Sequence, residues 1–469
     1  MVDIILKFVH VTFLVKIHYF QLMLRLSLIL LLLTETAFSQ SDLISLSIDE
    51  AVEYGVKNNR NLINAEREIL MAYNEKWKTI ATGLPQITAK LDYTNYIELP
   101  TSLIPLEKFG GPPGEFSEVQ FGREQTAFGS MRMEQQIFDG SWIVGLQATQ
   151  VYLETSKNFY EKTLLEVKEG VIKLYSLVSI LKEGVSLLKN NVENFKKDYY
   201  EISALYNNGF EEIENVEQIK ITLAQSEFLL KQTEKTYDNQ KDLLKLILGI
   251  KIENQLVLTT NFEELISGDI IFNKSIVDFI PDNNIEIKIS KNIFDTKTLE
   301  YKFEQSKRLP KITGFYSNSF TGYNDDFKFL QSDQKWFGSS LFGINLKVPI
   351  FSSLGLRASS QKAKYAMNQA ETSYVDQKER VYALVKHKLN DYLLALDSYN
   401  IDKENMLLSQ SIEEKNSIKF FEGMVSSFEL RQAQNQLLNA QQKYLNSVIN
   451  LISINAELET LFNKPITVK

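Results

Sequence analysis

Apolar residues recur every seven positions in two separate stretches of the chain, and the two series match each other. The first series consists of Val216, Leu223, Leu230, Tyr237 and Leu244, and the second of Leu430, Leu437, Tyr444, Leu451 and Leu458. Each series starts seven residues after a glycine, Gly209 in the first and Gly423 in the second. Because a seven-residue apolar repeat is typical of long helices that pack side by side, the pattern predicts a duplicated unit of long helices.

A longer apolar row precedes the first series. From Leu164 to Tyr206, apolar residues follow one another in alternating steps of three and four, which predicts one continuous helix. Extended back to Ser141, this helix would be roughly 100 Å long at 1.5 Å per residue. We therefore expect long helical hairpins at about 139–249 and about 352–463, each turning at its glycine. Proline, which interrupts helices, is missing from both stretches.

Between these helices the apolar period changes from helical spacing to strict alternation, which is typical of strands. Ile87, Ala89, Leu91 and Tyr93 fall on one face, and Phe342, Ile344, Leu346, Val348 and Ile350 alternate in the same way. The pattern predicts β-hairpins at about 85–138 and about 310–350, with polar loops over Pro100–Gly122 and Asp325–Phe337.

The predicted strands have the dimensions of membrane strands, because about 10 residues with one apolar face cross an outer membrane at a tilt. Four strands are too few to close a barrel, since single-chain barrels begin at about eight. An open apolar sheet in lipid would leave unpaired backbone groups at its edges. We therefore expect the strands of several subunits to combine in one barrel.

The chain divides into two repeats around a short middle segment. We expect a first repeat over residues 40–249, a mid-rod segment of mixed α/β character over 250–282, and a second repeat over 283–465. Each repeat starts with a shorter helix, which has the right length to stack end to end on the return helix of its hairpin. The capping box Ser47-x-x-Glu50 predicts where the first of these shorter helices begins.

The N-terminus has the pattern of an export signal. Arg25 is followed by the apolar run Leu26–Leu33, and small residues then favour cleavage before Gln40. We assign residues 1–39 to a signal peptide, with Met23 as the true start. The run is shorter than the about 20 residues of a spanning helix. The alternative is an N-terminal anchor helix.

Composition and charge exclude several classes of function. The formal net charge is -8, so the chain lacks the basic balance of a nucleic-acid-binding protein. It contains no cysteine, which excludes disulfides and thiol nucleophiles. His387 is the only histidine after the predicted cleavage site, and no P-loop, nucleophile elbow or H-E-x-x-H motif occurs. We expect no enzyme activity, no cofactor and no metal site.

Short motifs recur in both halves in the same order. Leu-Pro-x-Ile-Thr begins a predicted strand at Leu84 and again at Leu309. The other motifs are Leu46–Val52, Lys57–Asn59, Gln136–Gly140, Tyr206–Gly209, Pro349–Ser353, Phe420–Gly423 and Leu430–Gln434. In this order and duplicate placement they resemble the TolC family of outer-membrane efflux proteins, and the resemblance covers Leu46–Pro465.

The resemblance implies a mainly α fold with a membrane β part, assembled as a homotrimer. Its helices would form a hollow periplasmic α-barrel, and four strands from each of three protomers would form a shared twelve-stranded β-barrel in outer-membrane lipid. The helix tips would stay closed until a periplasmic adaptor (membrane fusion protein) and an inner-membrane transporter engage them. Such a channel passively exports substrates for a tripartite efflux or type I secretion system. The alternative is an exported coiled-coil scaffold or tether.

The resemblance also points to a constriction near the helix tips. In the family, acidic residues at the positions of Glu429 and Gln432 narrow the periplasmic entrance, and here Gln432 replaces the second acid. Three copies of Glu429 would form a polar ring that favours cations. Glu214 and Glu217 of the other hairpin are the alternative contributors, and a solvated helix face is the alternative interpretation of all four residues.

Adaptor docking is expected at the two helix turns. Gly209 and Gly423 are helix C-caps that need positive φ, whatever their further role. The resemblance adds a docking role for the turns, which consist of Asn207, Asn208, Gly209, Phe210, Glu422, Gly423, Met424, Val425 and Ser426.

Overall fold

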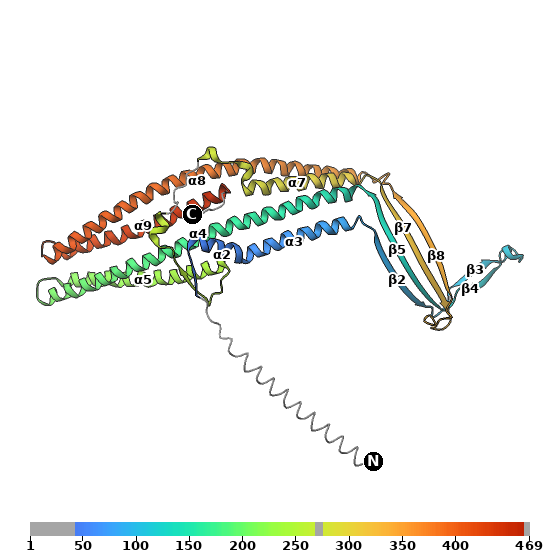
Figure 1. Ribbon diagram of the computed structural model, residues 1–469, viewed down its shortest axis with the longest axis horizontal. Helices are drawn as coiled ribbons and strands as arrows, with labels where there is room; N and C mark the ends of the chain where they lie inside the picture. Colours follow the sequence, from blue (N-terminus) through green and yellow to red (C-terminus); the bar gives the residue numbers. More distant parts are fainter. Residues whose placement is uncertain (1–42, 268–274, 464–469) are drawn as a thin grey trace, which may run out of the picture.

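The molecule is a helical rod with a curved β-sheet at one end and two helix turns at the other (Figure 1). A computed structural model of the chain describes residues 43–267 and 275–463. The predicted signal peptide, Met23 included, lies outside the described residues, as do the last positions of the predicted second repeat.

Two long helical hairpins form the rod. The first consists of α4 (Gly140–Asn207) and α5 (Ile213–Leu248), and the second of α8 (Gly355–Phe421) and α9 (Ser427–Leu461). The outgoing helices have 68 and 67 residues, and the return helices have 36 and 35. The predicted fold class is therefore confirmed for the helical part, and both halves have nearly the same dimensions.

Shorter helices complete the rod beside the long ones. They are α2 (Ile48–Asn58), α3 (Arg60–Ala81) and α7 (Ile285–Ser306). Helix α2 begins at the predicted capping box, in which the Glu50 carboxylate accepts a hydrogen bond from the Ser47 backbone N–H at 2.8 Å. This contact satisfies a backbone donor that the first turn of a helix leaves without a partner.

One asparagine joins each short helix to the end of the neighbouring return helix. Asn59 caps α3 and donates its side-chain N–H to the Ile247 carbonyl of α5 at 2.7 Å. Asn284 caps α7 and donates in the same way to the Leu461 carbonyl of α9 at 2.8 Å. Both halves therefore use the same contact. The amide side chain accepts from backbone N–H groups at the start of one helix and donates to a backbone carbonyl at the end of the other, and these groups have no partner within their own helices.

The four long strands form one antiparallel sheet in the order β2-β5-β7-β8. They are β2 (Gln86–Asn95), β5 (Gln125–Asp139), β7 (Lys311–Asn324) and β8 (Trp336–Lys347). The central β5–β7 pair joins the hairpins of the two halves, so β2 and β8 are the edges. Among the described residues, no helix is both long and apolar enough to cross a membrane.

One predicted loop contains a strand pair that the sequence pattern did not indicate. Within Pro100–Gly122, β3 (Thr101–Pro105) and β4 (Phe116–Gln120) form a small antiparallel hairpin beyond the end of the main sheet (Figure 1). Each strand has only 5 residues, and prolines and glycines lie between them. Such short segments carry too few alternating positions to stand out from a loop.

The middle of the rod carries the expected small α/β patch, but one of its strands comes from elsewhere. Strand β6 (Gln255–Leu258) and helix α6 (Phe262–Ser267) lie in the predicted segment. The partner of β6 is β1 (Leu43–Leu46), which runs parallel to it from the start of the first repeat. A parallel partner lies far away in sequence, so local patterning does not predict the pairing.

The helices keep the same lateral order as the strands. Helix α3 contacts α4, α4 contacts α7, and α7 contacts α8, which matches the order of β2, β5, β7 and β8. On the tip side, α5 contacts α4, α4 contacts α9, and α9 contacts α8. Helices α4 and α9 are therefore central, whereas α3, α5 and α8 form the two sides of the protomer.

Candidate functional site

The two helix turns have the same backbone geometry and lie at the same end of the rod (Figure 1). Gly209 and Gly423 have φ values of 80° and 72°, and the residue after each donates its backbone N–H to the carbonyl five positions earlier, at 2.9 Å and 2.8 Å. This pattern closes a helix with a left-handed glycine. Phe210 and Met424, which follow the glycines, are 79% and 68% exposed.

The remaining turn residues predicted for docking have unequal environments. Asn207, Asn208 and Glu422 are exposed, although the Asn208 side chain donates to the backbone carbonyl four residues earlier at 2.8 Å. Val425 packs against the apolar cluster of the tip end instead. Ser426 is the N-cap of α9. A docking partner would therefore meet Phe210 and Met424 first.

Glu429, the first predicted constriction residue, has a structural contact of its own. Its carboxylate accepts hydrogen bonds from the backbone N–H of Ser426 at 2.9 Å and from the Ser426 hydroxyl at 3.1 Å. These hydrogen bonds, led by the backbone one, hold the pKa of Glu429 below its ordinary value. The side chain is exposed, so a negative charge is held at a defined place at the start of α9.

The other three predicted constriction residues lie in the first turns of the return helices, Gln432 on α9 and the two glutamates on α5, but are not joined to Glu429. Gln432, Glu214 and Glu217 are exposed. Glu214 accepts a hydrogen bond from Gln218 of its own helix at 3.1 Å. Within the described part of the chain, no hydrogen bond or ion pair links any two of the four. A ring of these residues would require further copies of the chain.

Arg431 is a tip residue that sequence reasoning passed over. It is 9% exposed, its Nη1 atom is buried without a hydrogen bond, and its guanidinium lies 5.6 Å from the centre of the Phe428 ring. Burial lowers the pKa of Arg431, while the charges of Glu211 and Glu214 oppose that shift. Arg431 therefore faces the acidic start of α5 from the start of α9.

A buried polar cluster connects the two hairpins behind the tips. Gln434 of α9 donates to the Asp198 carboxylate of α4 at 2.6 Å, and the two residues are 7% and 4% exposed. Burial raises the pKa of Asp198. Burial, with the charge of Asp198, also raises the pKa of Glu413 of α8. The sequence contained one signal that could have revealed these two residues, namely their polarity. Arg431 and Gln434 occupy inward positions between Leu430 and Leu437, where apolar residues are expected.

The register of the sheet separates an apolar face from a polar one. Directly opposed residues share a face, and successive residues alternate. One row across the four strands consists of Ile87, Met133, Tyr316 and Phe342. On the opposite face, a row consists of Lys90, Ser130, Ser319 and Ser339. The apolar row is open, since Ile87 is 66% and Phe342 85% exposed.

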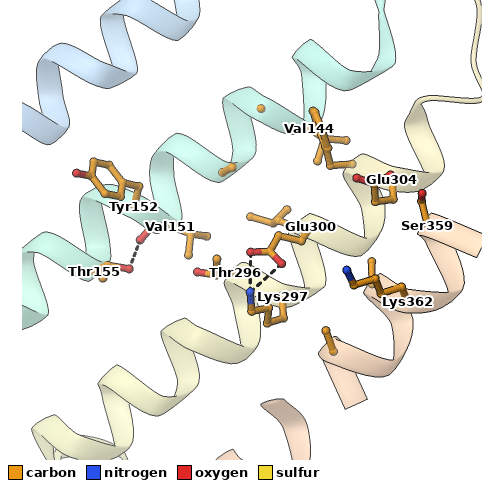
Figure 2. A pocket seen from close by; sticks show the side chains of 16 residues that line it. Val144, Val151, Tyr152, Thr155, Thr296, Lys297, Glu300, Glu304, Ser359 and Lys362 are labelled. Carbon is orange, nitrogen blue, oxygen red and sulfur yellow. Dashed lines mark hydrogen bonds and ion pairs between the residues drawn. The ribbon is translucent and has the colours of Figure 1, made fainter. Parts of the chain in front are cut away.

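A groove of about 890 Å³ lies among α4, α7 and α8, and Figure 2 shows the side chains that line it. Its walls carry mostly small or apolar residues, together with a Lys297–Glu300 ion pair at 2.9 Å. The Thr155 hydroxyl donates to the Val151 carbonyl. Within residues 43–267 and 275–463, no cluster of three or more His, Asp or Glu could hold a metal ion.

The fold of this chain is similar to the folds of several solved outer-membrane proteins. Its fold matches the VceC outer membrane protein of Vibrio cholerae at a TM-score of 0.66 and 14% identity, over 89% of this chain and 96% of that one. It matches the CmeC channel of Campylobacter jejuni at 0.71 and 16%, over 89% and 85%. The open MtrE channel of Neisseria gonorrhoeae matches at 0.71 and 12%, over 89% and 88%.

Sequence comparison identifies the family in the second half of the chain. Residues 295–464, from within α7 to just beyond the end of α9, match the outer membrane efflux protein family. No curated protein sequence matches the chain. The second half of the chain is therefore similar in sequence to the outer membrane efflux protein family, and the fold of both halves is similar to that of the solved channels.

Proposed function

We propose that this protein is the outer-membrane channel of a tripartite efflux or type I secretion system and that three copies form one tube. The observation that carries the proposal is that both sides of the protomer present unpaired strand edges and exposed apolar helix residues among the residues that the structure describes. One side consists of β2, α3 and α5, and the other of β8 and α8. Because sheet and helices share one lateral order, a single rotation between copies would close both.

The open sides carry apolar side chains as well as unpaired strand edges. On α8, Leu393, Leu394 and Ile401 are 58%, 68% and 58% exposed. On the opposite side, Trp77 of α3 and Phe228 of α5 are 62% and 69% exposed. Exposed apolar rows of this kind mark protein interfaces. A copy of this chain offers both a complementary strand edge and a complementary apolar helix side.

The two faces of the sheet suit the two sides of a membrane barrel. The apolar face would meet lipid, and the face with lysine and serine residues would line an aqueous lumen. In lipid, the edges of β2 and β8 need partners, because an unpaired backbone group costs several kcal/mol there. A scaffold or tether would have no use for this sheet.

The tips would be the regulated end of the tube. Phe210 and Met424 are the exposed apolar residues that a periplasmic adaptor would contact, and the inner-membrane transporter would supply the energy. Glu429, with Gln432, Glu214 and Glu217, is proposed to line the entrance, where three copies of an ordered carboxylate favour cations. The channel itself needs no catalytic group and no cofactor.

The test is the state of the purified protein and its conductance. The protein should sediment with the outer membrane, require detergent, and run as a heat-modifiable trimer that conducts ions in planar bilayers. Ala89→Pro in the edge strand β2 removes a backbone donor and should abolish the trimer. A soluble elongated dimer without detergent would exclude the channel.

A further inference from the structure

The two corners at which the sheet meets the long helices are equivalent in the duplicated plan but differ in structure. At the first corner, β5 runs directly into α4. Asp139 caps that helix by accepting from the Ser141 backbone N–H at 2.9 Å, and Gly140 is buried. At the second corner, residues 348–354 separate β8 from α8, and the N-cap residue Leu354 makes no side-chain cap; only a long hydrogen bond of 3.5 Å, from the Leu356 backbone N–H to the Ser352 hydroxyl, reaches the first turn. We call residues 348–354 the connector.

The connector is strained and apolar. Ser353 and Leu354 have φ values of 48° and 65°, a left-handed conformation that costs a non-glycine residue about 1–2 kcal/mol. Ile350, Phe351 and Leu354 are 92%, 83% and 65% exposed. Strained segments with exposed large apolar side chains persist where something outside the protomer covers them.

Two arginines without acidic partners lie beside the connector. Arg308, after the end of α7, donates from Nη2 to the Leu356 carbonyl at 3.4 Å, which places it at the first turn of α8. Arg357 follows in that turn, and both side chains are exposed. Neither arginine has a carboxylate within ion-pair distance among the residues that the structure describes.

A second copy of the chain would not supply the missing acid. If β8 pairs with β2 of the next copy, the segment that precedes β2 lies beside the connector. That segment, Lys76–Gln86, contains Lys76 and Lys78 and no acidic residue, and the nearest acid, Glu75, is already paired with Lys78 at 3.2 Å. The seam between copies would therefore gather cations from both sides at the height where the apolar face of the sheet ends.

We propose that the connector binds an anionic phospholipid of the periplasmic leaflet. The headgroup phosphate would contact Arg308 and Arg357, because guanidinium groups bind phosphate through paired hydrogen bonds. The acyl chains would cover Ile350 and Phe351. Cations at the level of the headgroups and apolar side chains below them are the combination that anchors a protein to an anionic lipid surface. This inference rests on the proposed membrane location.

The test compares the wild type in lipid nanodiscs of phosphatidylcholine alone with nanodiscs in which a quarter of that lipid is phosphatidylglycerol. The measured quantity is the temperature at which the trimer dissociates. Phosphatidylglycerol should raise it for the wild type by several degrees, whereas inorganic phosphate added to phosphatidylcholine discs should not. Arg308→Gln with Arg357→Gln should remove this shift, because each cation is worth about fivefold in affinity for an anionic surface.

Two variants serve as controls. Lys231→Gln removes an exposed lysine of α5 and should keep the full phosphatidylglycerol shift. Ile350→Ser with Phe351→Ser should lower the dissociation temperature in both lipid mixtures and should also reduce the phosphatidylglycerol shift, and Ile137→Ser at the first corner should do both to a smaller extent. The inference is overturned if the arginine variant keeps the shift or if Lys231→Gln loses it. It is also overturned if the Ile350→Ser, Phe351→Ser variant separates the subunits while phosphatidylglycerol still raises the dissociation temperature by the same amount. That result would show that the connector contacts the neighbouring subunit and not lipid.

Failure of this inference is distinguishable from failure of the proposed function. A wild-type trimer that conducts but responds equally to both lipid mixtures leaves the channel in place and excludes the lipid site. A protein that stays soluble without detergent and does not enter nanodiscs excludes both.

Discussion

The two halves of the protomer share their backbone plan but differ where elements end. Both helix turns close with a left-handed glycine, and both short helices are joined by an asparagine to a return helix. The starts of the return helices differ: Ser426 and Glu429 form a capping box on α9, whereas Glu212 makes no side-chain cap on α5. The corners at the sheet differ as well.

The difference teaches that duplication determines the length and shape of the rod, while the ends of its elements are free to diverge. How deeply a helix is buried depends on its place in the protomer and not on which half of the chain it belongs to. The two central helices, α4 and α9, come from different halves. Residues such as Arg431, Asp198 and Gln434 lie where the two hairpins meet. We therefore expect exchanges between equivalent positions to have unequal effects.

The largest difference is expected at the ends of the two return helices. Gly249 ends α5 at φ 78°, and a Cβ there would lie 2.2 Å from the Asn58 carbonyl oxygen; its counterpart Asn463 already carries a Cβ at φ 49°. Gly249→Ala should cost about 3 kcal/mol or more, because a backbone clash adds to the φ strain. Asn463→Gly should cost only about 1 kcal/mol, because it relieves the φ strain while it removes the side-chain hydrogen bonds to Glu161 at 2.6 Å and to the Asn283 carbonyl at 2.9 Å.

Loss of helical circular dichroism in urea measures both changes. Gly423→Ala is the matched control, since no atom lies within 4 Å of its added Cβ and only the φ cost of about 1 kcal/mol applies. Equal losses of unfolding free energy for Gly249→Ala and Gly423→Ala would contradict the close approach of Gly249 to the Asn58 carbonyl.

Charge reversal at Arg431 should have the next largest effect. Arg431→Glu places a third acid opposite Glu211 and Glu214 in a nearly buried position, which should cost about 2–3 kcal/mol and separate the tips. The expected readout is a larger single-channel conductance with a lower dissociation temperature. Arg431→Leu should be far milder, because the buried arginine already has an unpaired Nη1 atom. An Arg431→Glu channel with wild-type conductance would show that this residue does not hold the tips.

The contact between hairpins should weaken as pH rises. The pKa of the Asp198 carboxyl is raised by burial, so the folded protein binds its proton more tightly than the unfolded chain does. Stability is therefore highest below the ordinary pKa and falls as pH rises through the raised one. Amide hydrogen exchange at the ends of α4 and α9 should be faster at pH 8 than at pH 5, after correction for intrinsic rates.

Asp198→Asn should flatten that profile and stabilise the contact at pH 8 by on the order of 1 kcal/mol, because a neutral amide still bonds Gln434. Glu413 also has a raised pKa, so the double variant with Glu413→Gln completes the series. Exchange that stays equally pH-dependent in the double variant would exclude this cluster as the cause.

Helix caps should distinguish the two return helices by a smaller amount. Ser426→Ala removes the cap of α9 and should cost about 1 kcal/mol, whereas Glu212→Ser would give α5 a cap and stabilise it by roughly 0.5 kcal/mol. Urea unfolding followed by circular dichroism measures whether each variant lowers or raises the free energy of unfolding. A change of unfolding free energy in the same direction for both variants would mean that capping does not distinguish the two return helices.

Glu429→Gln should have the smallest effect on folding, because glutamine also completes a capping box. Only the charge changes, so the dissociation temperature should stay the same while cation selectivity of the channel falls. Glu217→Gln measures the contribution of the other hairpin to the selectivity in the same way. Unchanged selectivity and unchanged cation block in Glu429→Gln would remove this residue from the constriction.

Much of the fold could be predicted because it is built from long periodic elements. The heptad series, the alternation from Ile87 to Tyr93 and the glycines of the turns each predicted an element that the structure contains. The β3–β4 hairpin and the β1–β6 pair were missed, since short strands carry weak periodicity and a parallel partner is distant in sequence.

Less of the candidate site could be predicted. The turn residues were located by their glycines, and the constriction residues remain a proposal. Gln434 was noticed only as part of a motif. Its contact with Asp198 could not be predicted, because the two residues are 236 positions apart in the sequence. The connector was recognised as a corner, but its exposure and left-handed residues are properties of the folded chain.

The sequence by itself determined the length of the rod, the position of each turn and the apolar face of each strand, because these follow from local periods of 3.5 and 2 residues. Only the tertiary structure decided that strands and helices share one lateral order, that α4 and α9 are central, and that both sides of the protomer are open. Those properties depend on which elements become neighbours, and packing between distant segments determines that.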